Sequence, residues 1–240
     1  MKKLSLVIAV CLPLGLLATH AISETMTKID APNISTTNEN KAVANVAEVD
    51  QQAEDAQRFL NITNAMDTFQ ATFEQLSVSN TRNSMQERSG TLKIKSPGKF
   101  AWIITSPYEI YELSNGEKLW KYDVDLEEVD INKVSEKNNQ FMRLLQSEET
   151  APLLKEYQIF ADRYGDESVF SFIPLSDQLG FSQITISFVN EQLNNIRIQT
   201  DLEQATIFDF NDVVINEPIR DSEFELAIPE GVDVYDNTLF

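Results

Sequence analysis

The spacing of hydrophobic residues changes along the chain from a helical period to a period of two. Between residues 48 and 61, apolar side chains recur at roughly helical spacing, and Asp50 stands near the start as a possible N-cap. This pattern predicts one amphipathic helix. From Asp67 onward, apolar and polar residues alternate in short runs that end at turn residues, which is typical of β-strands.

A short helical pattern divides the predicted strands into two groups. In this insertion, Phe141, Leu144 and Leu145 share one face. Asn115-Gly116 predicts a tight hairpin, so successive strands should pair antiparallel. We expect a mainly β protein with helices (α+β), built on one large, strongly curved antiparallel sheet. The predicted strands cover residues 69–73, 92–94, 100–104, 111–114, 118–123, 129–131, 157–161, 169–173, 183–189, 194–200, 205–215 and 224–227.

The first residues have the composition of a secretory signal. Lys2 and Lys3 precede an apolar run over residues 4–17, and the small residue Ala21 suits cleavage. The mature chain should therefore be exported to the periplasm. No later run of 18 apolar residues occurs, so no membrane span is expected. The predicted division is a signal peptide over 1–21, a flexible Thr/Asn-rich leader over 22–50 and a folded domain over 51–240.

Cleavage of the signal peptide would remove the only cysteine, Cys11, and the only histidine, His20. The mature chain would then have no Cys nucleophile, no Ser-His-Asp triad, no zinc site of the usual kind and no disulfide. Nucleotide-binding motifs and the common hydrolase signatures do not occur either. We expect no catalytic residue, no metal and no cofactor.

Acidic side chains outnumber basic ones by 38 to 19, which gives a formal net charge of −19. Nucleic acids bind clustered Lys and Arg, so a nucleic-acid partner is not expected. Carboxylates cluster at residues 125–130 and 209–212. At this acidic content we interpret both clusters as solvated surface, with a carboxylate-based hydrolase as the alternative.

Several predicted strands are apolar on both faces. Two helical segments are few to fill the concave side of so many strands, so we predict a hydrophobic pocket there. The alternative is that these side chains fill an ordinary core. The predicted cavity wall consists of Leu92, Ile94, Phe100, Trp102, Ile104, Trp120, Tyr122, Phe170, Phe172, Ile184, Ile186 and Phe188.

An ordered set of motifs over residues 51–236 resembles the LolA family of periplasmic outer-membrane lipoprotein carriers. No single motif is specific, but their order along the chain is. The motifs are Phe69-x-Ala-x-Phe73-x-Gln75, Gly90-x-Leu92-x-Ile94-x-x-Pro97-x-x-Phe100-x-Trp102, Ser114-Asn-Gly116-x-x-Leu119-Trp120-x-Tyr122, Phe141-Met142-x-Leu144-Leu145 and Pro229-x-Gly231-Val232-x-Val234.

The resemblance implies an incomplete β-barrel whose hydrophobic cavity takes up acyl chains beneath a helical lid. The lid residues would be Phe141, Met142, Leu144 and Leu145. The implied partners are acylated lipoproteins, an inner-membrane lipoprotein-releasing ABC transporter and the outer-membrane receptor LolB. We expect a monomer. A related lipid-binding or envelope-sensing module on the same sheet is the alternative.

The chain departs from the family just before Pro97. Many members have an arginine there that holds the lid closed, whereas this chain has Ser96. Leu92 and Ile94 set the inward phase of this strand, so Ser96 should face the mouth of the cavity. Serine offers one donor on a short arm, so we expect apolar contacts to hold the lid, with hydrogen bonding to Ser96 secondary.

Overall fold

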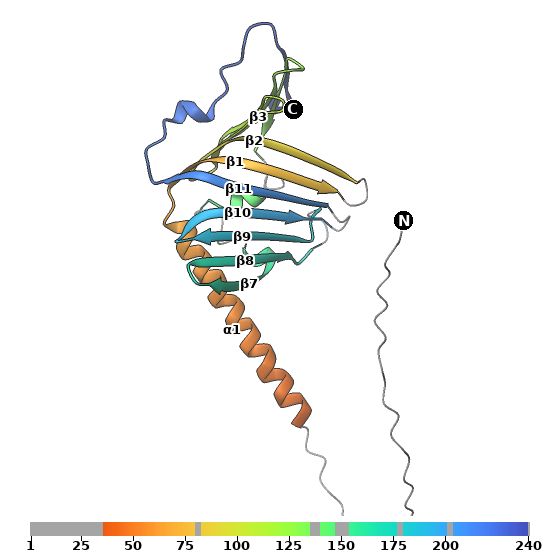
Figure 1. The fold of residues 1–240 in the computed structure, drawn as a ribbon, viewed down its shortest axis with the longest axis vertical. Coiled ribbons are helices and arrows are strands. Elements are labelled where there is room, and N and C mark those ends of the chain that lie inside the picture. Colours follow the sequence, from red (N-terminus) through yellow and green to blue (C-terminus); the bar gives the residue numbers. More distant parts are fainter. Residues whose placement is uncertain are drawn as a thin grey trace, which may run out of the picture.

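The computed structural model describes residues 36–79, 83–134, 140–146, 154–176, 180–200 and 204–239. The predicted signal peptide, with Cys11 and His20, lies outside the described residues. Within them, a single sheet of twelve strands forms the body of the protein (Figure 1). The strand order is β12-β6-β5-β4-β3-β2-β1-β11-β10-β9-β8-β7.

The strands follow one another mostly as antiparallel neighbours. In chain order they are β1 (Thr68–Ser79), β2 (Ser84–Lys95), β3 (Lys99–Ser106), β4 (Ile110–Asn115), β5 (Lys118–Asp123), β6 (Glu128–Lys133), β7 (Tyr157–Tyr164), β8 (Glu167–Pro174), β9 (Gln183–Val189), β10 (Gln192–Gln199), β11 (Gln204–Ile215) and β12 (Asp233–Asp236). The hairpin predicted at Asn115-Gly116 joins β4 to β5 and is confirmed.

The expectation of a wholly antiparallel sheet is wrong, because β12 lies parallel to β6. The two outer strands, β12 and β7, do not pair with each other, so the described sheet is open. A terminal strand at residues 224–227 is also wrong. Phe224 instead ends the short 3-10 helix η3 (Asp221–Phe224), where its buried ring explains the apolar signal.

The main helix, α1 (Thr36–Asn64), includes the predicted helical segment and begins well before it. Residues 36–50 are therefore helical, not a flexible leader. The insertion between the two groups of strands forms α2 (Gln140–Leu144), as its spacing predicts. Two further 3-10 helices are η1 (Leu154–Glu156) and η4 (Asn237–Leu239). Within the described residues, no helix is both long and apolar enough to cross a membrane.

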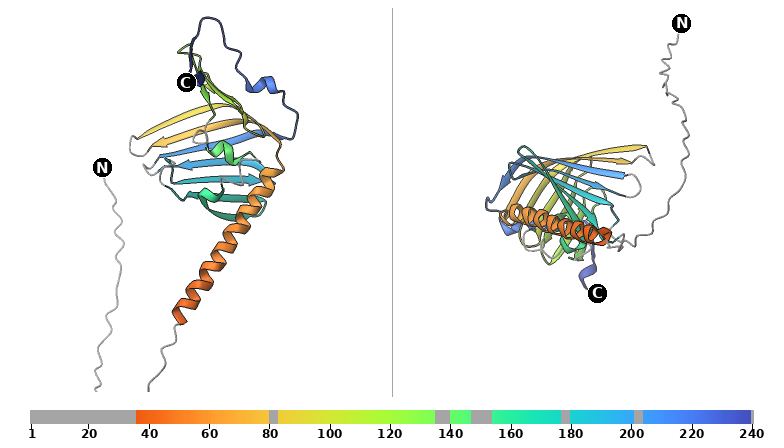
Figure 2. Two further views of the ribbon diagram at one scale, coloured as in Figure 1. Left: turned by 180° about the vertical axis from the view of Figure 1, so that it is seen from behind. Right: turned by 90° about the horizontal axis from the view of Figure 1, so that it is seen from below.

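The sheet curves around α2 and the C-terminal part of α1 (Figure 2). Its concave face carries the larger hydrophobic cluster, which includes Phe59 of α1 and Met142, Leu144 and Leu145 from α2 and the residue after it. A second, smaller cluster lies on the opposite face of β3 to β6. Side chains alternate between the faces of a strand, so strands that are apolar throughout can supply both clusters.

Candidate functional site

The concave cluster is assembled by strand register. Across β2 and β3, Leu92 lies opposite Trp102 and Ile94 lies opposite Phe100, which places these side chains on one face. All four are at least nine-tenths buried. On β1, Phe69 lies opposite Ile94 and continues the same wall.

Most of the predicted cavity residues meet in this cluster. Those that it brings together are Leu92, Ile94, Phe100, Trp102, Ile104, Phe170, Phe172, Ile184, Ile186 and Phe188. Rings that the sequence reasoning did not select also belong to it: one from α1, and four that alternate in the same way along β1 and β11. These are Phe59, Phe69, Phe73, Phe208 and Phe210.

The assignment of Trp120 and Tyr122 to the cavity wall is a mistake. Trp120 pairs with Leu113 and Tyr122 with Tyr111, and both contribute to the cluster on the opposite face. The residue opposite Trp102 is Glu112, which in turn lies opposite Lys121. Because a shift of one residue exchanges the two faces of a strand, apolar content alone does not reveal which alternation points inward.

The predicted lid packs into the concave cluster. Met142, Leu144 and Leu145 are each at most 2% exposed. The side chain of Phe141 lies outside the described residues. Three fully buried hydrophobic side chains within four positions are typical of a short segment held by packing rather than by its own helical hydrogen bonds.

A hydrogen bond connects this segment to the turn between β2 and β3. The backbone N–H of Gly98 donates to Oε1 of Gln146, with 2.5 Å between nitrogen and oxygen, and Gln146 is 2% exposed. The hydroxyl of Ser96 is also buried near this turn, but it has no hydrogen-bond partner among the described residues. The side chain that joins the two segments is thus Gln146, which the sequence reasoning missed because amide side chains are common on surfaces.

A cavity of about 160 Å³ lies within the concave cluster. Phe100, Trp102, Ile104, Phe208 and Met142 form its apolar wall, and its polar lining comes from Gln75, Arg88 and Glu112. Aromatic rings pack closely in this part of the cluster: the centroids of Phe73 and Trp102 are 4.3 Å apart, and those of Trp102 and Phe208 are 5.1 Å apart.

The other half of the concave face is filled by α1. The ring of Phe59 lies edge-on to Phe172 and Phe170, with centroids 4.8 Å and 5.2 Å apart. Aromatic pairs in this geometry attract one another beyond their loss of exposed area. The cavity therefore lies on the β1–β3 side of the cluster, next to Met142 of α2.

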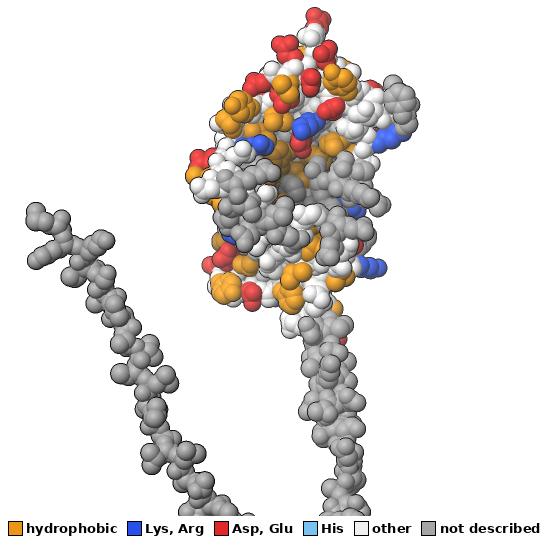
Figure 3. All heavy atoms as spheres, turned by 90° about the vertical axis from the view of Figure 1, so that its right-hand side faces the viewer, with side chains coloured by type: hydrophobic (Ala, Val, Ile, Leu, Met, Phe, Trp, Pro, Cys, Tyr) orange, Lys and Arg blue, Asp and Glu red, His pale blue; other side chains and the backbone are white. Residues whose placement is uncertain are grey.

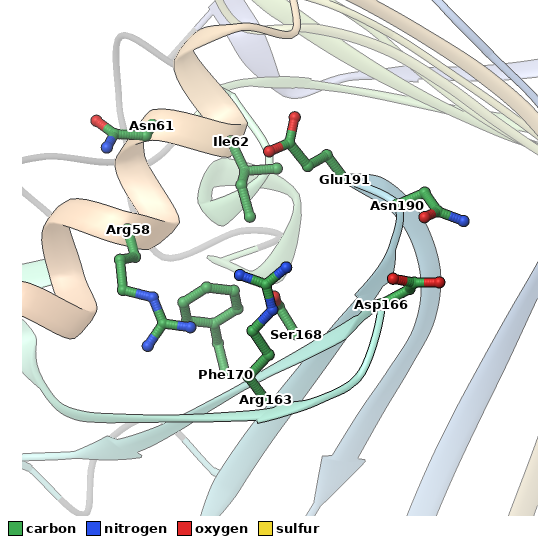
Figure 4. Close-up of a pocket in the computed structure, with 9 residues that line it drawn as sticks. All are labelled: Arg58, Asn61, Ile62, Arg163, Asp166, Ser168, Phe170, Asn190 and Glu191. Carbon is green, nitrogen blue, oxygen red and sulfur yellow. The ribbon is translucent and has the colours of Figure 1, made fainter.

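A second, more polar pocket of about 480 Å³ lies beside the end of α1, next to the turns that follow β7 and β9. Figure 4 shows Arg58 from α1 and Arg163 from β7 around the ring of Phe170. The guanidinium carbon of Arg58 is 5.8 Å from the centre of that ring, and Nη1 of Arg58 is 3.4 Å from Oδ1 of Asp55. Because Asp166 and Glu191 also line the pocket, its charges are balanced, and it resembles a solvated boundary of the core.

The surface around the concave side is hollowed. Figure 3 shows hydrophobic side chains around a depression in one face, and acidic side chains at the end that carries β3 to β6.

Among the described residues, no group of three or more Asp, Glu, His or Cys side chains could hold a metal ion. Within the cluster, burial raises the pKa of Tyr157 to about 12, so its phenol stays neutral at physiological pH.

Comparisons with known proteins identify the family to which the chain is similar. A family model described as "Outer membrane lipoprotein carrier protein LolA" matches residues 64–227. An outer-membrane lipoprotein carrier protein of Pseudomonas aeruginosa is 32% identical over 191 residues, which are 80% of this chain and 91% of that protein. One of Hahella chejuensis is 34% identical over 70% of this chain and 82% of its own length. A solved structure of an uncharacterized conserved protein from Thermus thermophilus covers 75% of this chain and 98% of its own, with 10% identity and a TM-score of 0.49.

Proposed function

Because the chain belongs to the LolA family of outer-membrane lipoprotein carriers, we propose that its concave face binds the acyl chains of lipoproteins. The proteins of this family are non-enzymatic periplasmic carriers. The observation that supports the proposal here is the cavity next to Met142 of α2, whose apolar wall extends a buried cluster of aliphatic and aromatic side chains. Such a surface binds hydrocarbon without any reactive group.

The size of the cavity requires that α2 move when cargo enters. A cavity of about 150 Å³ holds one benzene ring. The space of about 160 Å³ beneath α2 is therefore much too small for several acyl chains. Displacement of Met142, Leu144 and Leu145 would remove one side of the cluster and enlarge the site. We propose that α2 is the lid and that the structure shows it packed against the concave cluster in the closed position.

Energetics determine how the cargo leaves. A triacylated lipoprotein carries on the order of 40 methylenes, and each contributes roughly 0.8 kcal/mol on burial. The sum exceeds the roughly 20 kcal/mol at which non-covalent affinities saturate. Release into water is therefore excluded, and cargo has to pass directly between apolar sites. We propose an inner-membrane ABC transporter as the donor and a LolB-like outer-membrane receptor as the acceptor.

Analysis of the protein purified from a periplasm tests the carrier function. Mass spectrometry should find intact lipoproteins bound to the wild type. Trp102→Ala removes apolar surface from the cavity wall and should reduce the amount of bound lipoprotein. Tyr122→Ala, on the opposite face, is the matched control and should leave that amount unchanged. Free lipid without lipoprotein would indicate a general lipid-binding module, and the absence of both would contradict the proposal.

A cross-link tests the lid. The variant Ser96→Cys/Gln146→Cys, treated with a short bismaleimide, would join the segment after α2 to the end of β2. Loading of a fluorescent acyl probe should then fall sharply, while each single variant should load at least as fast as the wild type after the same treatment. Normal loading of the cross-linked protein would show that α2 is a fixed part of the core.

A further inference from the structure

Strand β2 has a neighbouring strand on both sides over only part of its length. Its pairing with β1 runs the whole length, from Thr68–Lys95 at one end to Ser79–Ser84 at the other. Its pairing with β3 stops at Ser89. Among the described residues, no strand pairs with the outer edge of β2 over residues 84–88. Figure 1 shows the hairpin of β1 and β2 extending beyond the other strands.

The local sequence explains why the pairing of β2 with β3 stops at Ser89. The register of β2 and β3 shifts between Ser89 and Gly90, and a Cβ atom at Gly90 would lie 1.9 Å from the carbonyl oxygen of Ile103. Only glycine allows this close approach of the two backbones. After Ser106, β3 meets Pro107, which has no N–H to continue the ladder. The chain thus ends the pairing at a defined residue.

The free edge of β2 differs from the outer edge of β7. There α1 lies alongside, and the backbone N–H of Ala161 donates to Oδ2 of the buried Asp55 over 3.0 Å. Proteins commonly block outer strands in this way, because unpaired backbone groups recruit other chains. The edge at residues 84–88 has no such cover among the described residues, and its residues 84–87 are exposed.

The free edge begins where the cavity ends. Arg88 is the first β2 residue beyond the pairing with β3, and it lines the cavity together with Gln75, which lies opposite it on β1. Beyond this level the concave face becomes polar: Nε2 of Gln75 donates to Ser77 over 3.0 Å, and the hydroxyls of Ser77 and Thr206 are 3.2 Å apart. The apolar site therefore opens onto a polar surface beside an unpaired strand.

We propose that the outer edge of β2, residues 84–88, binds the polypeptide segment next to the acylated residue of the cargo as an added β-strand. This inference rests on the proposed function, since acyl chains in the cavity would place their attached peptide beside Arg88. Strand addition uses main-chain hydrogen bonds, which every peptide sequence can form. The edge would therefore bind cargo of different sequence and keep the peptide extended at the mouth of the cavity.

Three lipopeptides test the inference on the full mature protein. The first is a triacylated cysteine amide, the second adds an uncharged six-residue tail, and the third carries that tail with N-methylated backbone amides. Two or three hydrogen bonds should make the second ligand bind about tenfold more tightly than the first. N-methylation should abolish this gain. Amide hydrogen exchange over residues 84–88 should slow with the second ligand only.

Two proline variants provide the matched control. Adjacent residues in an antiparallel strand direct their main-chain groups to opposite sides, so only one of Gln86 and Glu87 faces the free edge. The two variants are Gln86→Pro and Glu87→Pro. Proline at the position that faces β1 should disrupt the β1–β2 hairpin, whereas proline at the position that faces outward should preserve it. The variant with the intact hairpin should lose the tenfold gain and keep its affinity for the tail-free lipid. Equal binding of all three ligands would overturn this inference and leave the carrier function intact. Failure to bind any of them would contradict the carrier function itself.

Discussion

The two faces of the sheet are both covered, but by contacts of different kinds. On the concave face, a five-residue helix packs on a cavity through hydrophobic side chains, and Gln146 accepts a hydrogen bond from Gly98. On the convex face, the segment around η3 packs on Trp120 and Val129, and a pocket of about 570 Å³ lies beside it, between Tyr111 and Leu226. Apolar contacts have no preferred direction and can be exchanged for those of a ligand.

Ion pairs hold the convex cover in place. Asp221 lies 2.7 Å from Nζ of Lys95 and 3.1 Å from Nζ of Lys99, and Glu223 pairs with Lys93. Lys95 also donates to the carbonyl oxygen of Ile219 over 3.0 Å. The lysines come from β2 and β3, the strands that wall the cavity on their other face. The convex cover thus has directed polar contacts at its rim in addition to its buried hydrophobic side chains.

The largest effect on folding should come from the convex cover. Phe224 is fully buried against the sheet, so Phe224→Ala should lower the free energy of unfolding by about 3–5 kcal/mol. Urea denaturation would measure this loss. Because the cavity lies on the other face, the variant that remains folded should keep its affinity for an acyl probe. A loss of probe binding in folded protein would show that the two faces are coupled.

The largest effect on the lid should come from Leu144→Ala. Leu144 is fully buried beneath the sheet, and its truncation should cost about 2–5 kcal/mol of packing within the concave cluster. Amide hydrogen exchange over residues 138–150 should accelerate, and bound acyl probe should dissociate faster. Exchange in β9 should change much less, because the lid can open without the sheet unfolding. Unchanged exchange in the lid would contradict a cover held by apolar contacts.

Removal of the amide of Gln146 should have an intermediate effect. Gln146→Leu keeps much of the volume but leaves the N–H of Gly98 without its acceptor, at a cost of about 1–3 kcal/mol. Lid exchange should rise by at least fivefold, and the global free energy of unfolding should fall by no more than this cost. Gln146→Glu retains an acceptor oxygen and serves as the control. Equal effects of both variants would indicate that packing, rather than the hydrogen bond, matters at this position.

Acid should loosen the convex cover before the concave one. The hydrogen bond from Lys95, reinforced by Lys99, lowers the pKa of Asp221, and that from Lys93 lowers the pKa of Glu223. A lowered pKa contributes stability above the unfolded-state pKa, and this stability is lost as pH falls through the folded-state pKa. The contribution should therefore be constant at neutral pH and decline below about pH 4.

The two tryptophans report on the two faces separately. In Trp102→Phe protein, the fluorescence of Trp120 should change as acid releases the convex cover, whereas in Trp120→Phe protein Trp102 should respond at lower pH. The change at Trp120 should disappear in the Asp221→Asn/Glu223→Gln background. Simultaneous transitions of both tryptophans would show that the covers do not differ in acid sensitivity.

Local signals predicted much of this architecture. Asn115-Gly116 specifies a hairpin through its own backbone preferences, and the spacing of Leu144 and Leu145 predicted α2. The faces of Trp120 and Tyr122 could not be predicted, because register across β3, β4 and β5 decides which alternation points inward.

Other features depend on contacts that are distant in the sequence. Strand β12 pairs with β6 across about a hundred residues, so its four residues carry little local signal. The free edge of β2 follows from the point at which β3 leaves it, and the role of Gln146 follows from its distance to Gly98. Hydrophobic patterning reveals which residues are buried, but it does not reveal which backbone groups remain unpaired.

The smallest effect should come from Ser96, which stands just before Pro97 in the turn between β2 and β3. Its hydroxyl is buried without a hydrogen-bond partner among the described residues, so Ser96→Ala removes no polar contact that the structure describes. The free energy of unfolding should change by less than about 0.5 kcal/mol, or rise slightly, because a buried unpaired hydroxyl is unfavourable. Lid exchange over residues 138–150 and retention of an acyl probe should stay at wild-type values. A large effect of Ser96→Ala, together with none from Leu144→Ala, would show that a polar contact at Ser96 holds the lid.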